Sequence, residues 1–140
     1  GAYAAVIPKF IMEFMQHKSP IVNGDGEYSR DLTYIDNVVQ INMLCLNVKD
    51  VDTINQVYNA AFGERTTLNQ LVEILKKNLS RFDDSIKEIN VVHGPIRKGD
   101  IPHSLASIQK AKQLLNYSPS YSIQKGLEEA IEWYWNNLPK

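Results

Sequence analysis

The chain has a single cysteine, no excess of charge of one sign and no long apolar run. One cysteine in 140 residues excludes an internal disulfide framework and is typical of a reducing compartment. The formal net charge of −1 argues against a nucleic-acid partner, because binding to phosphate backbones requires a basic surface. No apolar run approaches the length of a membrane span, and no basic and then apolar segment opens the sequence. We therefore expect a cytoplasmic protein with no nucleic-acid and no membrane partner.

Several motifs for cofactor, metal and acyl chemistry are absent as well. No G-x-G-x-x-G or Walker-type sequence follows a strand, and no G-x-S-x-G sequence provides a hydrolase nucleophile. The spacing of His17, His93 and His103 fits no metal-ligand pattern, so we expect no zinc site. Cys45 lies among apolar residues in a helical segment, which favours a core residue over a nucleophile.

What is present predicts an α/β fold, with residues 1–140 forming a single domain long enough to bury a core. Apolar spacing and capping signals predict helices at residues 7–15, 35–48, 68–79, 108–115 and 123–137. Strands are expected at residues 20–22, 56–62 and 87–92, and a polar loop at residues 96–107. Apolar residues surround the helix at 35–48 almost completely, so we expect it to be buried on more than one side. Such a helix is unusual in an isolated small domain and expected between two domains.

Two loops place an arginine and an aspartate beside glycines. Arg30 and Asp31 follow the glycine-containing turn at residues 23–26, and Arg97 and Asp100 lie in the second loop. An arginine presents a planar fork of donors that matches phosphate oxygens, and an aspartate can accept hydrogen bonds from sugar hydroxyls. Either cluster alone is more often a solvated charged loop. Together they favour a divided site for a phosphorylated ligand that carries free hydroxyls.

Aromatic residues near the C-terminus offer two further candidates. Tyr121 and Lys125 have the Tyr-x-x-x-Lys spacing of short-chain dehydrogenases, but we interpret this as coincidence because Ser122 is expected to cap a helix there. Trp133 and Trp135 could stack on a sugar or a base. On a C-terminal helix, packing is the favoured interpretation.

Four stretches of the sequence, at residues 2–10, 23–38, 58–69 and 97–104, resemble extended short-chain dehydrogenase/reductase nucleotide-sugar epimerases. The resemblance is greatest to bacterial UDP-N-acetylglucosamine 4-epimerases and extends over the whole chain, but only to the C-terminal half of such enzymes. It implies the substrate-binding part of a Rossmann-fold enzyme whose NAD-binding core, with the catalytic tyrosine and lysine, is missing here. In that family, NAD takes a hydride from C4 of the sugar and returns it to the other face of the 4-keto intermediate.

The resemblance also implies roles for particular residues of this chain. Arg30 and Arg97 would hold the diphosphate, Asp100 would accept from the ribose hydroxyls, and Ser104 would leave room for a 2-acetamido group. The backbone of residues 21–23 would meet the uracil edge. The implied substrate-binding set is Val6, Ile21, Val22, Asn23, Arg30, Arg97, Asp100 and Ser104. One departure is Ala5, where many members carry an asparagine that contacts the substrate phosphate.

The implied whole protein is an NAD-dependent UDP-hexosamine 4-epimerase, and we expect this chain to be inactive alone. Its partners would be a UDP-sugar, the missing Rossmann half and, since such enzymes are commonly dimers, a second copy. UDP-uronate epimerases, dTDP-sugar 4,6-dehydratases and decarboxylases share the scaffold and remain alternatives, because a fold does not fix a function. Two alternatives from other classes are a non-catalytic nucleotide-sugar-binding module and a protein-interaction domain whose apolar helix meets a partner.

Overall fold

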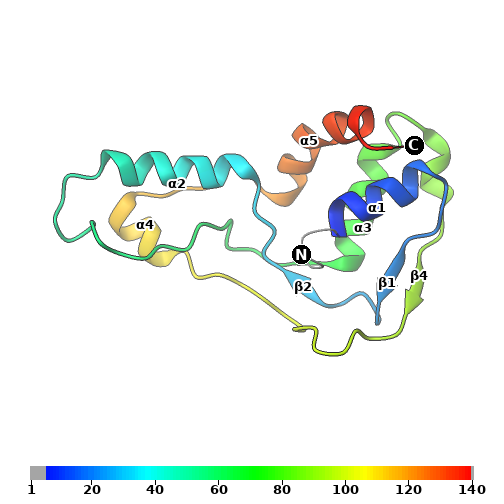
Figure 1. The fold of residues 1–140 in the computed structure, drawn as a ribbon, viewed down its shortest axis with the longest axis horizontal. Coiled ribbons are helices and arrows are strands. Elements are labelled where there is room, and N and C mark those ends of the chain that lie inside the picture. Colours follow the sequence, from blue (N-terminus) through cyan, green and yellow to red (C-terminus); the bar gives the residue numbers. More distant parts are fainter. Residues whose placement is uncertain (1–5, 140) are drawn as a thin grey trace. The chain divides into compact units, whose positions relative to one another are not determined.

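The computed structural model describes residues 6–139, whose elements are shown in Figure 1. The mixed α/β fold that the sequence predicts is confirmed. The chain divides into two compact units. Unit 1 consists of residues 1–28, 67–102 and 127–140, and unit 2 consists of residues 29–66 and 103–126. The expectation of a single domain stays a prediction.

The helices α1 (Val6–Met15) and α3 (Leu68–Leu79) pack against each other in unit 1 (Figure 1). Both bury the apolar face that their sequence spacing predicts. The buried residues of α1 are Phe10, Ile11, Phe14 and Met15, and the buried apolar residues of α3 are Leu71, Val72, Leu75 and Leu79. The predicted capping box is also confirmed: Thr67 accepts a hydrogen bond from the Gln70 backbone, and the Gln70 side chain accepts one from Thr67 N–H.

Unit 1 also contains a two-stranded parallel sheet formed by β1 (Ile21–Asn23) and β4 (Val92–Gly94). The strand predicted at residues 20–22 is confirmed with a shift of one residue. The strand predicted at residues 87–92 is wrong, because residues 84–88 form the 3₁₀ helix η1 (Asp84–Glu88). The Asp83 carboxylate accepts from Ser85 N–H and starts this turn, which buries Ile86. The strand begins only where Val92 N–H reaches the carbonyl of Pro20, at 2.9 Å.

Unit 2 is built around α2 (Ile35–Asn47) and α4 (Gln109–Leu115), with β2 (Ser29–Arg30) before α2. Thr66 of β3 (Thr66–Thr67) belongs to the same unit. The core cluster consists of Ile41, Ala61, Ile108, Ala111, Leu115 and Tyr117. The C-terminal helices confirm the predicted bounds to within one residue, since α4 begins at Gln109 and α5 is Ile123–Asn137.

The strand predicted at residues 56–62 does not form. Its side chains still alternate, because Tyr58 and Ala60 pack on the core of unit 2 while Val57 and Asn59 are exposed. No strand among residues 6–139 lies alongside it to complete a ladder, and a side chain bonds one of its carbonyls instead. The Tyr117 hydroxyl donates to the carbonyl of Ala61 at 2.9 Å. The sequence pattern therefore predicts the facing of these residues correctly, whereas strand pairing also requires a neighbour.

Within this chain α2 is buried on one face only, so its expected burial on more than one side stays a prediction. Only Asn37 and Ile41 are buried, with Leu44 and Val48 partly buried along the same face. Four large apolar residues of this helix are exposed: Ile35, Val39, Met43 and Leu46. Cys45 is exposed as well, which corrects the prediction of a core residue, because it lies beside the buried face and not on it.

The aromatic residues of α5 give a mixed result. The Trp135 ring stacks on Phe82, with centroids 5.0 Å apart, as the packing interpretation predicts. Trp133 is 61% exposed, so that interpretation is wrong for this residue. Tyr121 lies in the loop before α5, and Ser122 caps the helix by accepting from Lys125 N–H, as predicted.

Within residues 6–139, no helix is both long enough and apolar enough to cross a membrane.

Candidate functional site

The free edge of β1 is the first element of the candidate site. Its bonds to β4 use the carbonyl of Pro20 and the N–H of Gly24, which bonds to Gly94 at 3.0 Å. In a parallel ladder, alternate residues bond to the same neighbour, so the backbone groups of Ile21 and Asn23 point away from β4. Among the described residues the sheet has no third strand on that side. The backbone at residues 21–23 thus presents donors and acceptors along an open edge.

The turn after β1 lies beside the loop that carries Arg97 and Asp100. Gly24 has φ +67°, and a Cβ atom placed on it would be 3.1 Å from Cγ1 of Ile96, so Ile96 packs closely against this glycine. The next residue is Arg97, whose carbonyl accepts from Asp100 N–H at 3.1 Å in a tight turn. Gly99 adopts φ +79° within this turn. Unit 1 therefore brings the predicted base-contacting backbone and the second Arg–Asp cluster together.

A second group forms in unit 2, around Ser29. Residues Ser29 and His103 pair as a parallel bridge, their side chains approach to 2.9 Å between Oγ and Nδ1, and Ser104 N–H donates to the carbonyl of Ser29 at 3.1 Å. The same carbonyl accepts from Nη1 of Arg30 at 2.9 Å. Ser29 is buried, Arg30 is half-buried and Ser104 is exposed. The predicted phosphate contact and the predicted sugar contact of this unit are thus neighbours.

Asp31 has a role that the sequence did not reveal. Its Oδ2 accepts from Gly63 N–H at 3.1 Å and from Ala106 N–H at 3.4 Å, so this carboxylate joins two loops that are distant in sequence. Its Oδ1 is buried and has no hydrogen-bond partner among the described residues. Burial, with a smaller contribution from the Asp31 charge, raises the pKa of the Tyr117 hydroxyl above its ordinary value.

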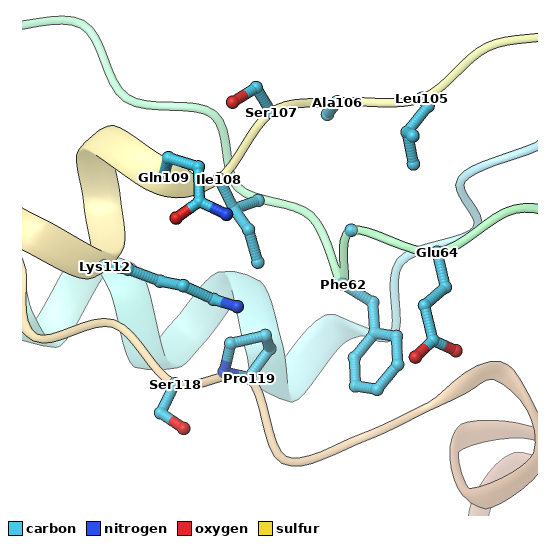
Figure 2. A pocket seen from close by; sticks show the side chains of 11 residues that line it. Phe62, Glu64, Leu105, Ala106, Ser107, Ile108, Gln109, Lys112, Ser118 and Pro119 are labelled. Carbon is cyan, nitrogen blue, oxygen red and sulfur yellow. The ribbon is translucent and has the colours of Figure 1, made fainter.

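The two loops that Asp31 joins form walls of a cavity of about 480 Å³ in unit 2 (Figure 2). Figure 2 shows the Lys112 side chain extending from α4 toward Pro119, with the Phe62 ring on the far side of Pro119. The cavity is also lined by Glu64 and Leu105. No local sequence pattern predicts this cavity, because the wall at residues 62–64 is more than forty residues from the others.

The implied substrate-binding residues therefore fall into two groups. Ile21, Val22, Asn23, Arg97 and Asp100 lie in unit 1, together with Val6 at the start of α1, and Arg30 and Ser104 lie in unit 2. Ala5, the departure from the family pattern, lies outside the described residues.

The starts of α2 and α3 lack the features of a dinucleotide site. A dinucleotide pyrophosphate needs free backbone amides at a helix start after a glycine-rich turn. The first turn of α3 is instead capped by its own Thr67 and Gln70 side chains, and no glycine lies between β2 and α2. Lys125 lies over the Tyr121 ring, 4.3 Å from its centroid, as a cation–π pair. Residues 6–139 contain no group of three histidine, cysteine or acidic side chains arranged to hold a metal ion.

Comparison with known sequences gives a family match over most of the chain. The sequence model described as GDP-mannose 4,6 dehydratase matches residues 2–130. The putative UDP-glucose 4-epimerase of Methanocaldococcus jannaschii is 29% identical, over 96% of this chain and 40% of the relative. The UDP-glucuronate 4-epimerase of Thermodesulfobacterium geofontis is 29% identical, over 93% and 38%. The UDP-N-acetyl-alpha-D-glucosaminuronate decarboxylase of Bacillus cytotoxicus is 26% identical, over 96% and 41%.

Solved structures agree with this match. UDP-glucose 4-epimerase of Thermotoga maritima with UDP-glucose is 34% identical with a TM-score of 0.79, over 96% of this chain and 40% of that one. UDP-N-acetylglucosamine 4-epimerase of Methanobrevibacter ruminantium, in complex with UDP-N-acetylmuramic acid, is 34% identical with a TM-score of 0.80, over 99% and 41%. UDP-glucuronic acid 4-epimerase of Bacillus cereus with UDP-glucuronic acid and NAD is 25% identical with a TM-score of 0.76, over 93% and 39%. The chain spans about two fifths of the length of these proteins.

Proposed function

Because this chain belongs to the GDP-mannose 4,6 dehydratase family, we propose that it forms the nucleotide-sugar-binding part of an NAD-dependent UDP-hexosamine 4-epimerase. The observation that carries the proposal is the pairing, in unit 1, of an open strand edge with an Arg–Asp turn. The first suits a nucleobase and the second a phosphorylated ribose. In this proposal the protein acts in the cytoplasm.

The open edge of β1 suits uracil. The imide edge of uracil carries one N–H donor between two carbonyl acceptors, and a strand edge offers the complementary carbonyl and N–H groups. The free backbone groups of Ile21 and Asn23 supply both kinds. Because β4 fixes this strand in register, the edge is formed before the ligand binds, which lowers the entropy cost of binding.

The two arginines suit a diphosphate. Arg97 lies in a turn fixed by Gly99, and Arg30 is anchored through the carbonyl of Ser29. In the proposed complex each guanidinium donates to phosphate oxygens, and Asp100, in the same turn as Arg97, accepts from the ribose hydroxyls. Binding energy from the nucleotide then holds the sugar in place for a reaction at C4.

The exposed apolar side of α2 supports the proposal that this chain is part of a longer enzyme. Ile35, Val39, Met43 and Leu46 recur at near-helical spacing and form an apolar stripe, defined by these four residues. Relatives of more than twice this length contain further sequence beyond the matched part. We propose that the stripe packs against a part of the enzyme outside this chain that binds NAD and carries the catalytic tyrosine and lysine. This chain alone is then inactive, and a second copy is the alternative occupant of the stripe.

A UDP-uronate enzyme is the second candidate function. The relatives named above include a UDP-glucuronate 4-epimerase and a uronate decarboxylase, with similar identities to this chain. Ser104 favours the hexosamine, because a small exposed side chain leaves room for a 2-acetamido group.

The test compares four ligands by calorimetric titration: UDP-N-acetylglucosamine, UDP-glucose, UDP-glucuronic acid and dTDP-glucose. The proposal expects the two UDP-hexoses without a carboxylate to bind more tightly than the others. It also expects Ser104→Tyr to weaken binding of UDP-N-acetylglucosamine more than that of UDP-glucose. Tightest binding of UDP-glucuronic acid would replace the hexosamine proposal with the uronate one.

A further inference from the structure

We propose that Asn69 is a positioning residue for nucleobase recognition, because its side chain fixes the turn that follows β1. This inference rests on the proposed function, since it assigns Asn69 to the base-contacting edge. Asn69 ends the stretch at residues 58–69 that resembles nucleotide-sugar epimerases, and the candidate site does not otherwise use it. It is the second residue of α3 and lies between Thr67 and Gln70, which form the capping box.

Four interactions converge on this one residue. Its Nδ2 donates to the carbonyl of Asp25 at 2.9 Å and to Oε1 of Glu27 at 2.7 Å. Its backbone N–H donates to the carbonyl of Gly26 at 3.1 Å. Its Oδ1 lies 3.3 Å from Nε2 of His93. The turn at residues 25–27 and the middle residue of β4 are therefore held by the same side chain.

An asparagine fits here better than its close relatives. Both of its N–H donors face acceptors, so an aspartate would set a carboxylate against Glu27 and the carbonyl of Asp25. A Cβ atom on Gly26 would lie 2.0 Å from Oδ1 of Asn69, so the backbone and the amide are in direct contact. A glutamine carries one more methylene group and cannot occupy this space without moving the turn.

The position of Asn69 couples the helix start to the strand edge. The capping box fixes where α3 begins, and hence where the Asn69 side chain projects. Through residues 25–27 it holds the exit of β1, and through His93 it holds the residue that pairs with Val22 in β4. Both routes set the position of the free backbone groups of Ile21 and Asn23, which the proposed function assigns to the base.

The test uses Asn69→Ala and Asn69→Asp, with Asn90→Ala as the control because Asn90 is an exposed asparagine in the same unit. Dissociation constants are measured by titration calorimetry for UDP, CDP and inorganic pyrophosphate. UDP and CDP differ only at the pyrimidine edge, so their ratio reports base recognition. We expect both Asn69 variants to weaken UDP binding by about tenfold, as the loss of a hydrogen-bonding contribution near 1.4 kcal/mol implies. The preference for UDP over CDP should shrink, and pyrophosphate binding should stay unchanged.

Amide hydrogen exchange without ligand supplies the second measurement. Both Asn69 variants should exchange faster at residues 24–27, while Asn90→Ala should not. An unchanged ratio of UDP to CDP affinity in Asn69→Ala would overturn the positioning role even where UDP still binds. A parent chain that binds no UDP would instead overturn the proposed function, and the exchange experiment would then report on the turn alone.

Discussion

Asn37 on α2 and Tyr121 in the loop before α5 exchange two hydrogen bonds. Nδ2 of Asn37 donates to the carbonyl of Tyr121 at 2.7 Å, and Tyr121 N–H donates to Oδ1 of Asn37 at 3.1 Å. Ser120 N–H also donates to that oxygen, at 3.1 Å. Asn37 is only 1% exposed, and its side-chain amide satisfies the hydrogen bonds of three backbone groups.

Replacing Asn37 should therefore destabilise the chain strongly. Asn37→Ala leaves three backbone groups without partners, and we expect a loss of about 2–4 kcal/mol in the free energy of unfolding, measured by urea denaturation. Asn42→Ala is the matched control on the same helix, since Asn42 is exposed and its side chain donates to the carbonyl of Val38, four residues earlier on that helix. Equal effects of the two substitutions would contradict this account of the Asn37 contacts.

Alanine substitutions at two glycines of unit 1 distinguish the cost of backbone strain from the cost of a steric clash. Gly26 and Gly99 both have φ +79°, but only Gly26 has a neighbour, Asn69, where a Cβ atom would go. Gly99→Ala should cost about 1 kcal/mol through its backbone conformation alone. Gly26→Ala should cost clearly more, because the Asn69 amide must also move. Thermal and urea unfolding of both variants give this difference, and equal costs would show that the clash relaxes freely.

The Asp83 carboxyl should make the unfolding free energy depend on pH in the acid range. Hydrogen bonds from Ser85 Oγ–H and Ser85 N–H, with a smaller effect of the nearby His17, lower the pKa of Asp83 below its ordinary value of 3.8. A lowered pKa in the folded state contributes stability that is present above pH 3.8 and is lost as the pH falls through the folded-state value. Asp83→Asn should therefore flatten the decline in unfolding free energy below about pH 4. Asp84→Asn serves as the control, and the idea fails if both curves keep the slope of the parent chain.

The apolar stripe on α2 should affect association and not stability. Val39→Asp and Leu46→Asp change side chains that are 51% and 79% exposed, so the unfolding free energy should change by less than about 0.5 kcal/mol. Binding of a hydrophobic dye and self-association in sedimentation experiments should fall. Asn90→Asp adds the same charge at an exposed position outside α2. If it has the same effect as Val39→Asp, charge and not the stripe controls association.

Local signals in the sequence were sufficient for most helices. The apolar spacing of α1 and the capping box of α3 depend on residues within one or two turns, and both are found as predicted. The strand expected at residues 56–62 fails for a non-local reason, because its alternation is present but no partner strand is. The exposure of Cys45 also has a non-local cause, because it depends on which side of α2 the core covers. The sequence of a helix that is apolar on nearly all sides does not indicate that side.

The residues of the candidate site are likewise predictable from the sequence only in part. Arginines and aspartates beside glycines can be recognised along the chain, so Arg30, Arg97 and Asp100 are visible as candidates. The contacts of Asn69 and Asp31 are not visible, because each joins segments that are far apart in the sequence. A polar residue at a helix start is more often a simple surface residue, and only the fold shows that Asn69 reaches the turn after β1.

The proposed function assigns the diphosphate of a UDP-sugar to Arg30 and Arg97, and calorimetric titration of UDP measures the contribution of each. Removing a phosphate-bound arginine should weaken binding by about 2–5 kcal/mol in each of Arg30→Ala and Arg97→Ala. The matched controls are Arg65→Ala in unit 2 and Arg81→Ala in unit 1, both exposed arginines outside the site. UDP affinity should fall in the first pair and stay unchanged in the second. Equal affinities in all four variants, or no UDP binding by the parent chain, would contradict this assignment.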